Sequence, residues 1–261
     1  MSLKHIPLVP PKKKPWKLII LGLVLVITIS GAYIYRYFFS PSSSRWSQYR
    51  PYLTDNSILG KERLVPGSIC GDAPFAFPTT GVIFGLWNQS YRPGHIHAGL
   101  DIFSGTQPGV TPNYSVYPGY LTRQPDWIST VIIRIPSDPL NPGQQIWTYY
   151  THMANAAGTE SYISPEFPPG TDEVLIPAGT FLGRQGNYSG NPNNPTGLHL
   201  HFSVVKDDGQ GQFLNELEIN NTYDPTPYFE MALNHTDNQN EFPVCKGDIN
   251  IEDWDLIAED E

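Results

Sequence analysis

The sequence has few charged residues, and its basic residues are especially scarce outside the N-terminus. Charged residues make up 16% of the 261 residues. Residues 1–36 hold six of the 16 basic groups and no acidic one, which leaves 10 basic against 25 acidic groups in residues 37–261, a net charge of −15. So acidic a chain does not attract nucleic acid through counterion release. No basic stripe interleaved with aromatic residues compensates, so the composition excludes nucleic acid as a partner.

Long hydrophobic runs are also lacking, with one exception near the N-terminus. The run from Leu18 to Tyr35 contains no charge. A transmembrane helix needs roughly 17–25 apolar residues, whereas the apolar core of a signal peptide spans about 7–15. No convincing A-x-A cleavage site follows, so the run predicts an uncleaved membrane anchor; a long, cleaved signal is the alternative.

The charges around this run predict its orientation. The cluster PKKKPWK precedes it, and by the positive-inside rule such a cluster stays in the cytosol. We therefore expect a single-pass protein of the cell membrane, attached through its N-terminal helix, with the remaining chain outside the cytoplasm.

Cysteine is nearly absent: the chain has only Cys70 and Cys245. Both lie in the part expected outside the cytoplasm, where an oxidising environment permits a disulfide. The pair lies near the two ends of the expected catalytic domain, so a bridge would tie these ends together. Two unrelated thiols are the alternative.

Turn-forming and aromatic residues are abundant instead, with 23 Gly, 26 Pro and 13% aromatics. This composition favours a mainly β fold. Short apolar runs bounded by Gly, Pro and Asn predict strands. The candidate strands are 81–87, 115–122, 129–135, 145–152 and 197–205. Most connections are too short for crossover helices, so we expect an antiparallel β-sheet. Long loops at 154–178 and 186–196 are candidates for gripping a substrate.

The predicted organisation has five parts, with one N-terminal transmembrane helix before the β domain. They are a cytosolic basic stub (1–17), the anchor (18–39), a linker (40–69), the catalytic domain (70–245) and a solvated, mobile acidic tail (246–261).

The stretch GLHLHFSVV at 197–205 places two histidines within a predicted strand. Side chains on a strand alternate between its faces. His199 and His201 therefore point to one side, and Leu200 and Phe202 pack on the other. This arrangement allows one histidine to bind a metal while the other lies beside it.

Two further histidine patterns supply the rest of a candidate zinc site. His97 and Asp101 lie four positions apart, and His201 offers a third ligand. A catalytic zinc site needs three protein ligands and one open position. His152 and His199 then remain as an acid or base and an electrostatic stabiliser for the attacking water. Each pattern alone is common: an H-x-H strand is more often a surface face or a satisfied buried pair.

Together, the motifs resemble those of the M23 (lysostaphin/LytM-type) zinc metallopeptidases, which cut peptide bonds in bacterial cell-wall peptidoglycan. The motifs are HAGLD at 97–101, YTH at 150–152, and GLHLHF at 197–202. The segments PFAFPTTGVIFGLW and GTFLGRQGNYSG add to the resemblance, which extends over roughly residues 74–228.

The resemblance implies a LytM-like antiparallel fold that binds one Zn²⁺ ion through His97, Asp101 and His201. It implies that His152 and His199 deprotonate the water or stabilise the oxyanion, and that peptidoglycan peptide cross-links are the substrate. By this reading His95 is a loop residue, and Tyr150 packs or contacts substrate.

Two other readings stay open at this point. The domain could be a non-catalytic or autoinhibited LytM-like module that binds wall peptide or regulates a partner hydrolase. It could also be a structural β domain whose histidines form a satisfied polar network. Loops longer than is typical of the family leave the cross-bridge chemistry undetermined.

Overall fold

The computed structural model describes residues 16–38, 63–89, 95–231 and 243–257. The chain separates into two compact units, Met1–Ser40 and Pro41–Glu261. In the first unit, helix α1 (Trp16–Phe38) covers the apolar run, and its large apolar side chains are exposed. Across the described residues, no helix reaches the length and apolar character needed to cross a membrane. The anchor therefore stays a prediction.

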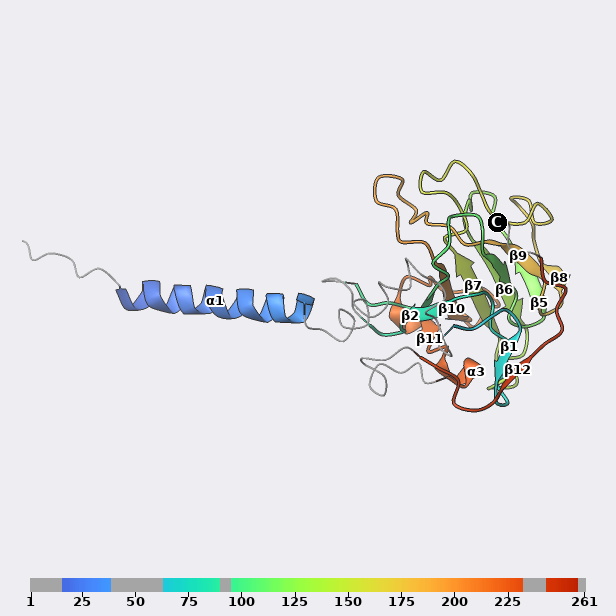
Figure 1. The fold of residues 1–261 in the computed structure, drawn as a ribbon, viewed down its shortest axis with the longest axis horizontal. Coiled ribbons are helices and arrows are strands. Elements are labelled where there is room, and N and C mark those ends of the chain that lie inside the picture. The colour runs from blue at the N-terminus through green and yellow to red at the C-terminus, as the bar shows by residue number, and fades with distance from the viewer. Residues whose placement is uncertain (1–15, 39–62, 90–94, 232–242, 258–261) are drawn as a thin grey trace, which may run out of the picture. The chain divides into compact units, whose positions relative to one another are not determined.

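The second unit is built on one antiparallel sheet with the order β2-β3-β10-β7-β6-β5-β8, and β11 pairs with β10 (Figure 1). Its strands are β2 (Val82–Gly85), β3 (Leu100–Phe103), β5 (Gly119–Thr122), β6 (Val131–Ile135), β7 (Ile146–Thr151), β8 (Val174–Ile176), β10 (Leu200–Lys206) and β11 (Thr222–Tyr223). Each of the five candidate strands overlaps one of these strands, which confirms the mainly β, antiparallel prediction.

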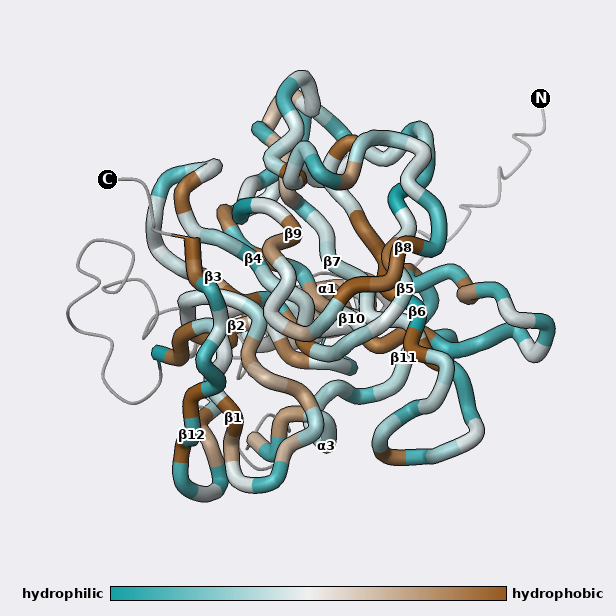
Figure 2. Tube along the Cα trace, turned by 90° about the vertical axis from the view of Figure 1, so that its right-hand side faces the viewer, coloured by the Kyte–Doolittle hydropathy of each residue, from teal (hydrophilic) through white to brown (hydrophobic). Residues whose placement is uncertain are grey.

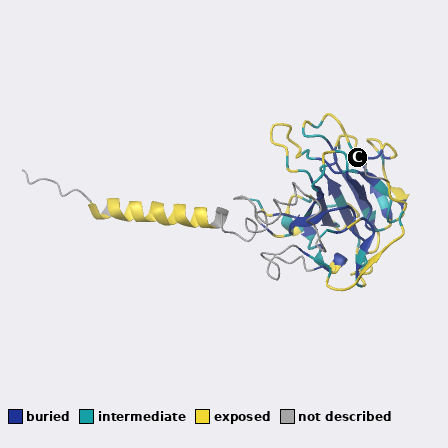
Figure 3. Ribbon diagram, in the orientation of Figure 1, coloured by how far each residue is buried: buried dark blue, intermediate teal, exposed yellow. Residues whose placement is uncertain are grey.

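Strand β10 lies between β3 and β7. Its side chains alternate between the main hydrophobic core on one face of the sheet and a second cluster on the other face. Leu200, Phe202 and Val204 belong to the main hydrophobic core, whereas Val205 belongs to a second cluster. Figure 3 shows the sheet strands mostly buried beneath more exposed loops. The predicted opposition of His201 to Leu200 and Phe202 is therefore confirmed.

Among the described residues of this unit, two small sheets and two short helices accompany the main sheet. They are β4 (Pro112–Tyr114) with β9 (Phe181–Arg184), β1 (Ser68–Cys70) with β12 (Ile249–Ile251), the 3-10 helix η3 (Ile219–Asn221) and α3 (Thr226–Phe229). At the sheet edge, Val174 and Leu175 of β8 are exposed, and they form a hydrophobic stretch in Figure 2.

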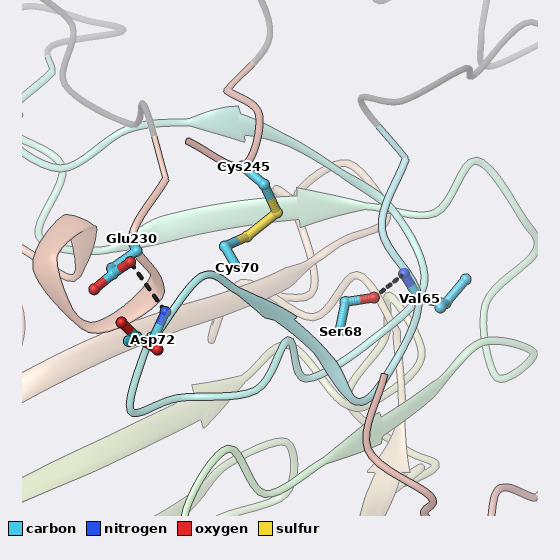
Figure 4. The surroundings of a disulfide bond; sticks show 6 residues. All are labelled: Val65, Ser68, Cys70, Asp72, Glu230 and Cys245. Carbon is cyan, nitrogen blue, oxygen red and sulfur yellow. Dashed lines mark hydrogen bonds between the residues drawn. A yellow bond between two sulfur atoms is a disulfide. The ribbon is translucent and has the colours of Figure 1, made fainter. Parts of the chain in front are cut away.

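The predicted disulfide between Cys70 and Cys245 is present, with a Cα–Cα distance of 5.1 Å (Figure 4). It joins the end of β1 to the chain just before β12. Near it, the amide of Asp72 donates a hydrogen bond to Glu230. The bridge thus ties together both ends of the folded unit.

The acidic segment that ends at Ile257 is largely exposed, as expected of a solvated tail, but it is attached to the fold. Strand β12 pairs with β1 in register from Ser68↔Ile251 to Cys70↔Ile249. The amide of Ile257 donates a hydrogen bond to the hydroxyl of Tyr114. Charge predicted a mobile tail here, whereas backbone pairing with β1 and the bond to Tyr114 attach the segment while its side chains stay exposed.

Candidate metal centre

The candidate site lies where β3, β10 and β7 are adjacent. The register places His201 opposite Asp101 on one side and opposite Thr151 on the other. His152 directly follows Thr151, and His199 directly precedes β10. Three strands of one sheet therefore bring together residues from all three histidine motifs.

Three side-chain atoms form a nearly equilateral triangle. The distances are 2.9 Å from His97 Nε2 to Asp101 Oδ1, 3.0 Å from His97 Nε2 to His201 Nδ1, and 2.9 Å from His201 Nδ1 to Asp101 Oδ1. These three residues form a group able to hold a metal ion. Both histidines are buried, and the Asp101 side chain is 14% exposed.

The hydrogen bond behind His97 determines which nitrogen faces the triangle with a lone pair. Its Nδ1 lies 3.0 Å from the carbonyl oxygen of Leu86, which can only accept, so Nδ1 carries the proton. In neutral His97, Nε2 then presents a lone pair to a carboxylate oxygen of Asp101. Two acceptors at 2.9 Å need a cation or a proton between them, as a metal site supplies.

The donor set and its spacing fit zinc. Tetrahedral zinc with ligand bonds of about 2.0–2.1 Å has ligand atoms about 3.3 Å apart. The three observed separations of 2.9–3.0 Å lie slightly below that value. Two imidazoles and one carboxylate leave one tetrahedral position for water, which is the ligand count of a catalytic site.

His152 and His199 repeat the orientation of His97. His152 Nδ1 lies 2.6 Å from the carbonyl oxygen of Tyr188, and His199 Nδ1 lies 2.7 Å from that of Gly197. Each carbonyl fixes the proton on Nδ1, so Nε2 is the unprotonated nitrogen of the neutral ring. The ring centroids of the two histidines lie 4.6 Å apart, and His199 Nε2 is 3.3 Å from Asp101 Oδ1.

His201 has the opposite orientation. Its Nδ1 faces the triangle, while its Nε2 lies 2.9 Å from the hydroxyl of Ser203 on the same strand face. The hydroxyl oxygen can accept a hydrogen bond from Nε2–H. Nδ1 then carries the lone pair that can bind a metal.

Two glycines make room for the triangle. A Cβ atom at Gly85 would lie 2.3 Å from Oδ2 of Asp101, and one at Gly99 would lie 2.3 Å from the carbonyl oxygen of Phe202. Real Cβ atoms do not approach other atoms so closely, so any side chain at either position would displace β3 or its neighbours. The sequence motifs gave no role to these glycines.

The ionisable side chains of the site shift one another's pKa values. Burial raises the pKa of Asp101, but the charges of His97 and His199 and its hydrogen bonds outweigh burial and hold that pKa well below its usual range. Burial lowers the pKa of His97, but Asp101 outweighs this effect and raises it. Burial, followed by the charges of His199 and His201, holds the pKa of His152 well below its usual value, so His152 is neutral near pH 7.

The remaining residues singled out in the sequence take other positions. The ring centroid of His95 lies 6.4 Å from that of His97, and His95 is not part of the ligand triangle. Tyr150 is fully buried and packs on Phe202, and its hydroxyl accepts a hydrogen bond from the amide of Val116. Tyr150 therefore packs in the core.

Sequence reasoning missed the residues beside the site that come from segments without a motif. A cavity of about 460 Å³ adjoins His152 and is lined by Tyr149, Trp127, Phe213 and Glu216, among others. Strand alternation could have identified Tyr149, which lies two residues before Thr151 on the same face. Nothing in the sequence around Glu216 indicates that its loop returns to this face.

Comparison with known proteins gives matches only among solved structures. No protein-family model and no curated protein sequence matches the chain. The catalytic domain of the prophage-encoded M23 protein EnpA from Enterococcus faecalis is 23% identical at a TM-score of 0.37, covering 56% of this chain and 96% of that one. Lysostaphin from Staphylococcus simulans is 16% identical at a TM-score of 0.33, covering 66% and 54%.

A LytM protein from Ruminococcus gnavus is 21% identical at a TM-score of 0.33, covering 50% of this chain and 45% of that one. This chain therefore spans about half the length of the lysostaphin and LytM structures. The names of these three proteins (M23, lysostaphin and LytM) are those of the family that the histidine motifs resemble. At such identities and TM-scores, the activity of this chain has to be argued from its own site.

Proposed function

We propose that this chain is a zinc-dependent endopeptidase that hydrolyses peptide bonds in bacterial cell-wall peptidoglycan. The observation that carries the proposal is the triangle of His97, Asp101 and His201 with two further imidazoles beside it. A metal-free network satisfies the 2.9 Å contact of His97 Nε2 with Asp101 Oδ1 only through a protonated His97, whereas one cation at the triangle satisfies all three donor atoms at once. The resemblance of the motifs to M23 peptidases supplies the substrate.

Each side chain of the site has its own role in this reaction. A zinc ion held by His97, Asp101 and His201 would supply a nucleophilic water at neutral pH and polarise the scissile carbonyl. His152, neutral through burial, accepts the proton of the attacking water at Nε2 and passes it to the leaving amine. His199 lies beside it and, with a proton on Nε2 as well as on Nδ1, stabilises the charge that develops on the carbonyl oxygen. The carbonyls of Tyr188 and Gly197 hold both rings in place.

Two histidine variants test this assignment in the full-length chain. His199→Ala should still bind one zinc ion but lose turnover by about 100- to 1,000-fold, the usual cost of removing one group that stabilises an oxyanion. His201→Ala should lose both zinc and turnover, because it removes a ligand. Zinc content and the peptide fragments released from cross-linked peptidoglycan are measured together by mass spectrometry.

His95→Ala is the matched control, because this histidine lies outside the triangle. It should keep both zinc and turnover. Full activity in both the His199 and the His201 variant would contradict the proposal. Zinc binding by the wild type without fragment release would favour the alternative of a wall-binding or autoinhibited module.

We also propose that the chain is a single-pass protein of the cell membrane with its second unit outside the cytoplasm. The uncharged run of residues 18–35 and the basic cluster before it support this location. The disulfide between Cys70 and Cys245 agrees with an oxidising compartment.

A further inference from the structure

The cavity of about 460 Å³ beside His152 has walls formed by aromatic side chains. Trp127 lies 6.1 Å from Tyr149 and 6.0 Å from Phe213 between ring centroids. All three pack against the cluster of Ile132, Trp147 and Val205, so the sheet fixes the wall. The cavity therefore presents rigid aromatic surfaces directly next to a residue of the proposed catalytic machinery.

The carboxylates that line the cavity give it a negative charge. Its lining residues include the carboxylates of Glu216 and Asp126 and no Lys or Arg. The Glu216 side chain is only 13% exposed, and its Oε2 lies 3.9 Å from His201 Nε2. Glu216 and Tyr149 line the same cavity, where burial first, and then the charge of Glu216, raise the pKa of Tyr149.

Arg123 does not neutralise this charge from inside the cavity, because it is not among the lining residues. Its guanidinium donates to the carbonyls of Trp127 and Phe167 and to the hydroxyl of Ser161. A largely buried carboxylate is costly to desolvate unless a positive group pairs with it. Aromatic faces within about 6 Å also attract cations.

We propose that this cavity binds a protonated amine of the substrate peptide, next to the scissile bond, through Glu216 and the faces of Trp127 and Tyr149. This inference rests on the proposed peptidase function and names a substrate class for it. A peptide carries such a group either as a basic side chain or as a free N-terminus, and both present the same ammonium chemistry. Asp126, exposed at the same cavity, adds attraction at longer range.

The test measures binding, so that it does not depend on turnover. Full-length chain is titrated calorimetrically with three glycine-rich peptides: one with a single lysine and blocked ends, its Nε-acetyl counterpart, and one without lysine but with a free N-terminus. We expect the lysine peptide to bind at least tenfold more tightly than the acetylated one. The third peptide shows whether an N-terminal amine occupies the same cavity.

Three variants identify the carboxylate responsible. Glu216→Gln should bring the lysine-to-acetyl-lysine affinity ratio close to one. The matched control Glu218→Gln, an exposed acid two residues away that does not line the cavity, should keep the wild-type ratio. Asp126→Asn should lower the ratio by about twofold to threefold, which keeps the proposal testable if Glu216→Gln misfolds.

Equal affinities of wild type for the charged and acetylated peptides would overturn the inference, as would a ratio that survives Glu216→Gln. The zinc content of Glu216→Gln separates a binding role from a role in holding His201, because only the latter lowers metal affinity. Peptidoglycan digestion by the same wild-type preparation tests the peptidase function separately. Digestion without an amine preference contradicts only the cavity, whereas an amine preference without digestion contradicts only the peptidase.

Discussion

His152 has a φ angle of +73°, which is uncommon for a residue with a side chain. It follows directly after β7, so the left-handed conformation ends the strand and interrupts the alternation of side chains. His152 thereby turns toward His199, while Tyr150, two residues earlier, stays in the core. Such a conformation costs about 1–3 kcal/mol and is concentrated at functional sites.

The low pKa of His152 predicts a pH dependence of stability for the metal-free chain. The folded state holds the neutral ring, whereas the unfolded state takes up a proton below its ordinary pKa near 6.5. The unfolded state then binds more protons, so the free energy of unfolding falls as the pH drops below about 6.5. Between pH 7.5 and pH 5.5, wild type should lose more stability than His152→Gln.

Guanidinium unfolding of both metal-free proteins, followed by tryptophan fluorescence, measures this difference. The opposing contribution of His97, whose pKa is raised, is present in both proteins and cancels in the comparison. An equal loss in the two proteins would show that His152 is not held neutral by the fold.

At the residue scale, spacing predicted those site members whose direction a strand determines. His199 and His201 had to share a strand face. The four-residue spacing of His97 and Asp101 allowed these two side chains to converge on the same point as the histidine pair. The left-handed turn at His152 could not be predicted, because contacts distant in sequence impose it. The position of Glu216 could not be predicted either, because a loop without any motif brings it beside His201.

At the scale of elements, the strands within the longer apolar runs were predicted, whereas β3, β9 and the strands of two or three residues were not. Strand β10 has alternating faces and was recognisable, but β8 spans only Val174–Ile176 and has two exposed residues. Strand β12 lies in an acidic segment, where composition argued against pairing. Short edge strands depend on the backbone groups that a neighbour offers, and these are not visible in sequence.

The disulfide next to β1 predicts a large contribution to stability. Cys70 and Cys245 are separated by 175 positions, and closing so long a loop stabilises by up to about 5 kcal/mol in the chain-entropy model. The Cys70→Ser/Cys245→Ser double variant should therefore unfold at a lower temperature and lower denaturant concentration than wild type. Calorimetry and guanidinium unfolding of both proteins measure the loss.

A reducing agent provides the control for this variant. It should destabilise wild type to the level of the double variant and leave the double variant unchanged. A double variant as stable as oxidised wild type would show that pairing of β1 with β12 holds the ends without the bridge.

At the scale of the whole molecule, the proposed location can be tested in bacterial cells. Full-length chain should sediment with membranes, resist extraction by high salt and be released by detergent. A variant without residues 1–39 should not fractionate with membranes, because the uncharged run is gone. External protease applied to spheroplasts should digest the second unit of the full-length chain.

Cells that express the full-length chain could instead yield a soluble product shortened at its N-terminus. That outcome would support the alternative of a cleaved signal. Protection of the second unit from external protease would contradict the predicted orientation. The two outcomes differ in chain length, so one immunoblot distinguishes them.

The alignment of Asp101, His201 and Thr151 across three paired strands has a thermodynamic consequence. An ion bound there would be held by the centre of the sheet, so it could not leave through the opening of a surface flap alone. Its binding energy would add to the global unfolding free energy, by about 4 kcal/mol at a free concentration a thousandfold above Kd. Chelation would then act on this protein as a mild denaturant, and metal supply would set the lifetime of the folded chain.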